Sequence, residues 1–240
     1  MKFKNTIEFS LSGNYALFTD PITRMGGEKS TYLVPTYEAL KGVCESIYWK
    51  PTIIWIVDKV RVMKPITTET KGIRPLKYSE GGNDLANYTY LKNVEYHVSA
   101  HFIRNEQRPD LYNDYNENKH YCIAKRYLEK GGRRDIFLGT RECGGYIEPC
   151  AFEESAGHYD NVPENDFGLM FHSFLYPSVT GKEELVANLD YIKMLNGVIQ
   201  FNPPEKVRLS RTVKEMEYKI IKTNGLTEFD GLLKNCEEDI

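Results

Sequence analysis

Residues 91–103 read Leu-Lys-Asn-Val-Glu-Tyr-His-Val-Ser-Ala-His-Phe-Ile and form the clearest strand pattern of the chain. Successive side chains of a β-strand point to opposite faces of its sheet. Apolar residues occupy one face, namely Val94, Tyr96, Val98, Ala100 and Phe102. Polar residues occupy the other, namely Glu95, His97, Ser99 and His101. The pattern predicts a strand with one face on the core.

Further elements are predicted on both sides of this strand. Before it we expect a strand over 2–12 that Gly13-Asn14 ends, a helix over 35–49 that Pro51 stops, and an Ile/Val-rich strand over 52–63. Residues 64–90 hold two prolines and several glycines, which indicates a long loop or a short projecting hairpin. After it we expect a helix over 116–130, stopped by Gly131-Gly132, and a strand over 145–152.

The order strand–helix–strand–strand–helix–strand is typical of the ferredoxin-like, RRM-like βαββαβ domain. We therefore predict an α+β fold whose first domain spans 1–153. Two helices on one face would leave the other sheet face free, and RNA-recognition modules use that face. Residues 154–240 are predicted to be a small, mainly antiparallel β domain. It would contain strands near 166–176 and 187–201, a hairpin turn at Asn196-Gly197, and an extended tail over 206–222.

Composition limits the function classes. The 240 residues carry 31 Lys+Arg against 34 Asp+Glu, a net charge of −3, which excludes a protein that binds nucleic acid by bulk positive charge. No apolar run is long enough to span a membrane, and no secretory signal is seen. Five scattered cysteines, an odd number, favour reduced thiols, so we expect a cytoplasmic protein.

Local charge departs from this average over residues 119–141. Seven Lys or Arg against two acidic residues give this stretch a net charge of +5. A solvated helix face explains it equally well. However, Gly131, Gly132 and Gly139 would let a phosphate backbone approach main-chain N–H groups, and Arg133-Arg134 would hold the phosphates.

Lys119-His120 stands at the predicted start of the second helix, where backbone dipoles favour anions. A histidine there can exchange protons near neutral pH, and the neighbouring lysine supplies fixed charge. The pair suits RNA cleavage by the RNA's own 2′-OH, although a dipeptide is a weak signal.

No metal or cofactor is expected. Asp110, Asp114 and Glu117 match neither an EF-hand nor a phosphodiesterase motif, and no glycine pair is followed by the Lys-Ser/Thr of a P-loop. On one strand, His97 and His101 would lie about 13 Å apart, too far to bind one ion by themselves.

Several motifs in order along the chain resemble one CRISPR-associated family. They are YALFTDP (15–21), GGEK (26–29), VPTY (34–37), ESIYWKP (45–51), MKPI (63–66), KHY (119–121) and GGRRDIFLG (131–139), and the likeness extends to residues 213–217. The family is the fifth Cas family in its subtype I-C (Dvulg) form, within the repeat-associated RAMP superfamily.

The resemblance implies a ferredoxin-like domain, a small β domain and a metal-independent endoribonuclease that cleaves CRISPR repeat hairpins in pre-crRNA. Its products would carry a 2′,3′-cyclic phosphate and a 5′-hydroxyl. The family's catalytic residues fall on Tyr48, Lys119 and His120, which would have to converge in space. RNA contacts are predicted for the basic residues of the two glycine-containing segments, namely Arg24, Lys29, Arg133, Arg134 and Arg141.

The resemblance also implies partners. The protein would stay on the crRNA 5′ handle as a subunit of the type I-C Cascade surveillance complex, beside backbone and large subunits. A non-catalytic crRNA-binding scaffold subunit is the alternative. A metal-dependent DNA nuclease is disfavoured because the sequence offers no carboxylate or histidine cluster.

Overall fold

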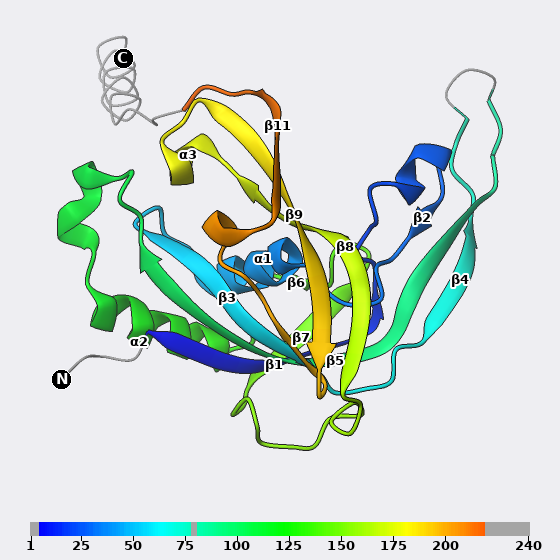
Figure 1. The fold of residues 1–240 in the computed structure, drawn as a ribbon, viewed down its shortest axis with the longest axis horizontal. Helices are drawn as coiled ribbons and strands as arrows, with labels where there is room; N and C mark the ends of the chain where they lie inside the picture. The colour runs from blue at the N-terminus through cyan, green and yellow to red at the C-terminus, as the bar shows by residue number, and fades with distance from the viewer. Residues whose placement is uncertain (1–4, 78–80, 219–240) are drawn as a thin grey trace, which may run out of the picture.

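A large, mostly antiparallel sheet with few helices makes up the computed structural model, which describes residues 5–77 and 81–218 (Figure 1). The fold is thus mixed α and β. The helices are α1 (Tyr37–Ile47), α2 (Glu117–Leu128) and α3 (Pro177–Thr180), with short 3-10 turns η1 (Thr23–Gly26), η2 (Pro109–Asp114) and η3 (Pro204–Lys206). The strands are β1 (Thr6–Ala16), β2 (Lys29–Ser30), β3 (Ile53–Val62), β4 (Thr68–Ile73), β5 (Ala86–Arg104), β6 (Ile136–Phe137), β7 (Gly144–Pro149), β8 (Glu164–Leu175), β9 (Glu184–Leu195), β10 (Val198–Gln200) and β11 (Leu209–Glu215).

The strand predicted over 91–103 lies inside β5, in the middle of the sheet. It pairs with β1 on one side and β3 on the other, both antiparallel, and the sheet runs in the order β3-β5-β1-β7. The first residues of β5 pair with β4 instead. In the segment predicted as a long loop or a projecting hairpin, β4 and the start of β5 therefore form the hairpin, as Figure 1 shows at the right.

Gly13 does not end the first strand, contrary to prediction. β1 continues through it to Ala16, and Gly13 pairs with Val94 of β5. A Cβ at position 13 would collide with the side chain of Leu138 and approach the carbonyl oxygen of Gly144. Glycine stands here because the neighbouring segment packs against the strand, so it marks a close contact rather than a turn.

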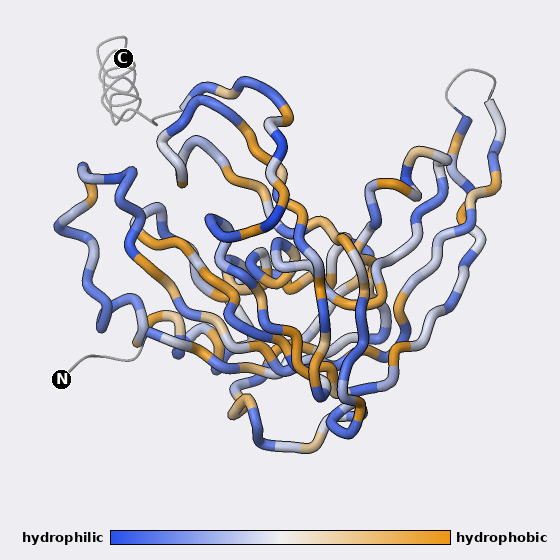
Figure 2. Tube along the Cα trace, in the orientation of Figure 1, coloured by the Kyte–Doolittle hydropathy of each residue, from blue (hydrophilic) through white to orange (hydrophobic). Residues whose placement is uncertain are grey.

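Both predicted helices are present and slightly shorter than expected. Thr36 caps α1 by accepting from Ala39 N at 3.2 Å, and Asn116 caps α2 by accepting from Lys119 N at 3.1 Å. Their buried side chains join those of the sheet in a single core that includes Phe9, Val98 and Phe102. Figure 2 shows hydrophobic residues gathered in the middle of the molecule, whereas the segment around η2 is mostly hydrophilic.

The C-terminal strands extend the same sheet. β10 pairs antiparallel with β3, and β9 pairs with β8, β10 and β11. Asn196 and Gly197 have φ angles of 48° and 78°, which confirms the predicted hairpin turn. Extended structure continues to Glu215, and residues 219–222 of the predicted tail lie outside the described residues.

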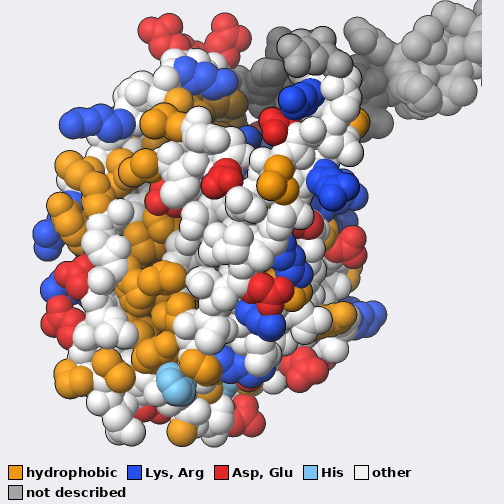
Figure 3. Space-filling view, turned by 90° about the vertical axis from the view of Figure 1, so that its right-hand side faces the viewer, with side chains coloured by type: hydrophobic (Ala, Val, Ile, Leu, Met, Phe, Trp, Pro, Cys, Tyr) orange, Lys and Arg blue, Asp and Glu red, His pale blue; other side chains and the backbone are white. Residues whose placement is uncertain are grey.

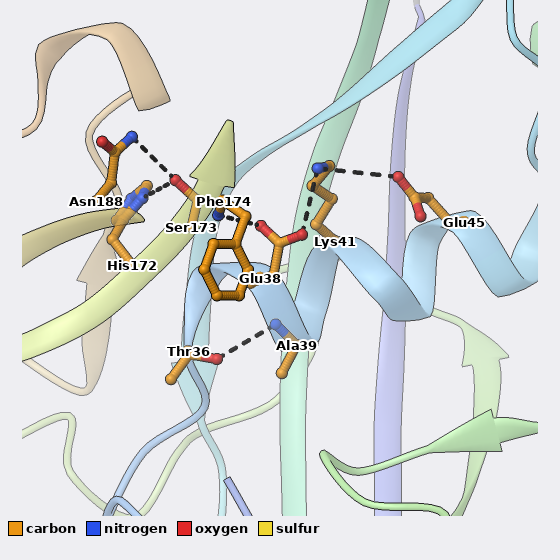
Figure 4. A network of polar contacts seen from close by, with 9 residues as sticks. All are labelled: Thr36, Glu38, Ala39, Lys41, Glu45, His172, Ser173, Phe174 and Asn188. Carbon is orange, nitrogen blue, oxygen red and sulfur yellow. Dashed lines mark hydrogen bonds and ion pairs between the residues drawn. The ribbon is translucent and has the colours of Figure 1, made fainter. Parts of the chain in front are cut away.

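A polar network ties α1 to β8 (Figure 4). Glu38 accepts from the Phe174 backbone N at 3.2 Å and pairs with Lys41 at 3.4 Å. Buried His172 bonds the Ser173 hydroxyl through Nδ1 at 2.9 Å, and its ring stacks on Tyr37 at 4.3 Å between centroids. The first helix is thereby held between the central strands and the C-terminal part of the sheet.

The sheet face opposite the helices is covered at its centre, so the prediction of a free face is wrong there. His97 and Ser99 are both 4% exposed. His97 Nδ1 donates to the Phe152 carbonyl at 3.2 Å, and the Lys59 ammonium lies 4.0 Å from the centroid of the Phe152 ring. The segment after β7 thus crosses this face and buries side chains that the strand pattern predicts to be exposed.

Exposed apolar side chains are found on the side that carries the hairpin, as Figure 3 shows. Ile22 and Met25 of the η1 region and Leu76 and Leu85 of the hairpin are all more than 60% exposed. No helix in the described part of the chain is long and apolar enough to cross a membrane.

Candidate active site

Tyr48 stands immediately after α1, not in its last turn as predicted. Its backbone is extended, with φ −158° and ψ 125°, while its N–H still donates to Cys44 O at 3.0 Å. Trp55 of β3 fixes this residue by donating from Nε1 to the Tyr48 carbonyl at 2.7 Å. The phenol ring is stacked with Tyr127 of α2, with 6.3 Å between centroids. These contacts direct the phenol toward the second helix.

His120 lies in the first turn of α2 and meets Tyr48 there. The distance from Tyr48 Oη to His120 Nδ1 is 2.8 Å, a hydrogen bond between residues 72 positions apart. The convergence that the family resemblance requires is thus present for these two side chains. Both helices contribute buried side chains to the same core, which brings the end of α1 close to the start of α2.

The Tyr48–His120 pair is buried. Tyr48 is 2% exposed and His120 0%, and the aromatic rings of Phe102 and Tyr115 lie 6.2 Å and 5.9 Å from the imidazole. His120 Nε2 has no hydrogen-bond partner among the residues that the structure describes. In this conformation, a bound molecule cannot contact His120 and has almost no access to Tyr48.

Burial also sets the protonation of the pair. It lowers the pKa of His120, and the charge of Lys119 lowers it further. Burial raises the pKa of Tyr48 to about 12, with a smaller contribution from the charge of Asp114. Both groups are therefore neutral at pH 7, and the hydrogen bond between them is a path for moving one proton.

Lys119 is at the surface, with 43% of its side chain exposed, and is held by Asp114. Its ammonium donates to Asp114 Oδ1 at 2.6 Å and to the Asp114 carbonyl at 3.0 Å. The hydrogen bond from Lys119 lowers the pKa of the Asp114 carboxyl. Thr52 also donates to this carboxylate, at 3.4 Å. An anion that reaches Lys119 must therefore compete with Asp114.

Sequence reasoning missed two charged residues of this site. Asp114 was considered only as part of a possible metal patch, and its partnership with Lys119 follows from the turn between η2 and α2. The charge of Lys50 acts on the pKa of both Asp114 and His120, which places it nearby. Its only sequence signal is membership of the ESIYWKP motif that also contains Tyr48.

The glycine-arginine loop after α2 is anchored close to Tyr48. The backbone N–H groups of Arg133 and Arg134 both donate to the Ser46 carbonyl, at 3.1 Å and 3.0 Å. Gly131 and Gly132 have φ angles of 81° and 106°, which L side chains rarely adopt, and so allow the loop to turn back onto α1. Both arginine side chains are exposed, as a phosphate-binding role requires.

The other three predicted RNA-binding residues lie elsewhere. Arg24 is exposed in η1, Lys29 of β2 lies over the Tyr88 ring at 4.9 Å, and Arg141 is exposed between β6 and β7. Among the described residues, no hydrogen bond or ion pair links them to Tyr48, Lys119 or His120. They do not belong to the same cluster.

No metal centre is seen in residues 5–77 and 81–218, where no three His, Cys, Asp or Glu side chains are grouped to hold an ion. His101 instead bonds the Asp58 carboxylate through Nδ1 at 2.9 Å. His97 is engaged with Phe152, as described above.

Comparison with known proteins identifies the family. The model of the Cas5d family, CRISPR-associated protein Cas5, matches residues 6–202. The chain belongs to this family. The resemblance seen in the sequence motifs is confirmed.

Two curated Cas5d proteins match most of the chain, and both are named CRISPR pre-crRNA endoribonuclease. The protein from Mannheimia succiniciproducens is 29% identical in an alignment of 185 residues that covers 68% of this chain and 75% of that protein. The protein from Thermus thermophilus is 28% identical in an alignment of 183 residues that covers 72% of this chain and 75% of that protein.

Solved structures share the fold over nearly their whole length. A CRISPR-associated protein superposes with a TM-score of 0.70 at 35% identity, covering 86% of this chain and 96% of the other. A functionally uncharacterized protein from Streptococcus mutans superposes with a TM-score of 0.68 at 37% identity, covering 86% and 97%. Both structures therefore share most of the fold described here.

Proposed function

We propose that this Cas5d chain is a metal-independent endoribonuclease that cleaves CRISPR repeat hairpins in pre-crRNA, with Tyr48, Lys119 and His120 as its catalytic residues. The observation that carries the proposal is the 2.8 Å hydrogen bond between Tyr48 and His120, beside the Lys119 ammonium. A proton-transfer pair next to a fixed positive charge is what transesterification of RNA needs. The names of the two curated relatives support the same activity.

In the proposed reaction, the 2′-oxygen at the cleavage site attacks the adjacent phosphorus. The P–O2′ bond forms and the P–O5′ bond breaks, which leaves a 2′,3′-cyclic phosphate and a 5′-hydroxyl. One proton leaves the 2′-oxygen and one reaches the departing 5′-oxygen, and the Tyr48–His120 pair serves these transfers. Lys119 stabilises the charge that develops on the phosphorane oxygens.

Burial of the pair adds a requirement to this reaction. Since Tyr48 and His120 are 2% and 0% exposed, the residues that cover them must move before RNA can reach the phenol or the imidazole. Tyr115 and the Asp114–Lys119 ion pair are among the residues next to the buried pair. We propose that an RNA phosphate replaces Asp114 as the partner of Lys119 and that the preceding turn moves with Asp114.

The same burial is the one observation that favours the alternative, a non-catalytic crRNA-binding scaffold. One experiment separates the two. A labelled repeat hairpin is incubated with the protein in EDTA, beside a matched hairpin that carries 2′-deoxy at the cleavage site. We expect a single cut in the first RNA and binding without cutting in the second. Normal cleavage of the deoxy RNA would contradict the mechanism, and tight binding of an uncut all-ribose hairpin would support the scaffold.

We also propose the wider setting that the family membership suggests. The protein would stay on the crRNA 5′ handle as a subunit of the type I-C Cascade complex, beside backbone and large subunits, in the cytoplasm. The strand order β7-β1-β5-β3, with α1 and α2 between its strands in sequence, supports a ferredoxin-like core. A division near residues 153 and 154 would separate this core from the C-terminal strands.

A further inference from the structure

A groove of about 590 Å³ lies between the glycine-arginine loop and β7. Its charges cancel, because Arg133 and Arg134 are accompanied by Asp135 and Glu148. A groove that only follows a phosphate backbone is positively charged. The composition of this groove instead fits a complete nucleotide, with phosphate and base both in contact.

Tyr146 of β7 supplies an aromatic surface in this groove. It is 75% exposed, whereas its neighbour Ile147 is 4% exposed and belongs to the core. Because side chains alternate along a strand, the Tyr146 ring points away from the core. Gly144 and Gly145 precede it, and a Cβ added at Gly144 would meet no atom within 4 Å. The ring is therefore exposed to solvent at the groove.

The groups around the ring match those that recognise a base. Asn14 and Glu148 line the same groove, and amide and carboxylate side chains pair with the hydrogen-bonding edges of bases. Single-stranded bases stack on exposed aromatic rings while basic side chains hold the backbone. Arg133 and Arg134 are in position for the second role.

The groove is also connected to the catalytic pair. Arg133 and Arg134 are bonded through their backbone to Ser46, two residues before Tyr48. The charge of Arg133 acts on the Tyr48 phenol. An RNA strand that leaves the cleavage site past Arg133 enters the groove directly.

We propose that this groove binds one unpaired nucleotide of the RNA substrate, with its base stacked on Tyr146. The inference rests on the RNA-cleavage function proposed above and adds a subsite that Tyr48, Lys119 and His120 do not provide.

The test uses the full-length protein and repeat hairpins in which 2-aminopurine replaces a single unpaired base beside the stem, one position at a time. Stacking on tyrosine quenches this fluorophore, so the wild-type protein should quench it at one position. Tyr146→Ala should abolish that quenching and weaken binding by about 5- to 150-fold, as expected for loss of one base–aromatic stack. Tyr146→Phe keeps the ring and should behave like the wild type.

Tyr191→Ala is the matched control, since Tyr191 is an exposed tyrosine (48%) on β9, outside the groove. Unchanged affinity and quenching in Tyr146→Ala, while the wild-type protein binds and cuts the hairpin, would overturn the subsite and leave the cleavage function intact. An equal loss in Tyr191→Ala would also overturn it. A wild-type protein that neither binds nor cuts any repeat hairpin would instead refute the proposed function.

Discussion

Removal of the Tyr48 hydroxyl is the sharpest test of the buried pair. Tyr48→Phe keeps the ring that stacks with Tyr127 and deletes only the group that bonds His120 Nδ1 at 2.8 Å. Because His120 Nε2 has no partner in the described part of the chain, both nitrogens of a fully buried imidazole would then be unsatisfied. A lost partner of a buried polar group costs about 1–3 kcal/mol, so the free energy of unfolding should fall by that amount.

The cleavage rate of Tyr48→Phe should fall by a much larger factor than its loss of folding stability alone would cause. Loss of a positioned proton-transfer group costs about 10²- to 10⁴-fold in rate, measured under single-turnover conditions with saturating protein. RNA affinity should change little, since the phenol is buried in the free protein. Urea unfolding and a binding titration on the same variant separate the three quantities.

Tyr127→Phe is the control, because it removes a neighbouring phenol that does not bond His120. It should cleave like the wild type. The double variant Tyr48→Phe/His120→Ala should be no slower than His120→Ala alone, as expected for residues that act as one unit. Wild-type cleavage by Tyr48→Phe would refute the reasoning.

Three more outcomes are expected. Arg133→Ala combined with Arg134→Ala should weaken RNA binding and reduce the log–log salt slope by about 0.7–0.9 per lost phosphate contact; an unchanged slope would show that the loop is only a solvated turn. Asp114→Asn should tighten RNA binding about 2- to 5-fold, because it removes the carboxylate that competes for Lys119. Asp110→Asn is the control and should not change RNA binding, because the Asp110 carboxylate pairs with Arg108 instead. Equal affinities of the two variants in a titration at low salt would contradict this. Burial lowers the pKa of His172 from 6.5 to about 4, so its neutral form contributes stability that is complete above pH 6.5 and lost as the pH falls toward 4. Between pH 7 and 4, the free energy of unfolding measured in urea should fall by about 3 kcal/mol more for the wild type than for His172→Phe. Equal losses in the two proteins would argue against a stabilising role of neutral His172.

Local patterns in the sequence were enough to predict the central strands and both main helices. Residues 94–102 alternate between apolar and polar without interruption, and Thr36 and Asn116 mark the helix starts by their capping side chains. Gly13 was misread because nothing local reveals that Leu138, 125 positions later, packs against it. The cover on His97 was missed for the same reason, since it comes from a loop beyond β7.

The candidate site was likewise predictable only where local sequence carries the signal. Lys119-His120 was noticed from its place at a helix start, whereas Tyr48 entered only through the family resemblance. A contact across 72 positions depends on how two helices pack, which periodicity does not encode. Tyr146 could have been noticed as an aromatic residue directly after two glycines, in the strand predicted over 145–152.

In the function proposed above, concealment of Tyr48 and His120 would let the protein discriminate among RNAs. Any RNA could approach Lys119, but only one with enough additional contacts would favour the conformation in which the imidazole is uncovered. Nucleotides far from the cleaved bond then govern the speed of cutting as well as the strength of binding. A hairpin stripped of its flanking nucleotides should therefore be a poor substrate even at concentrations that saturate the protein.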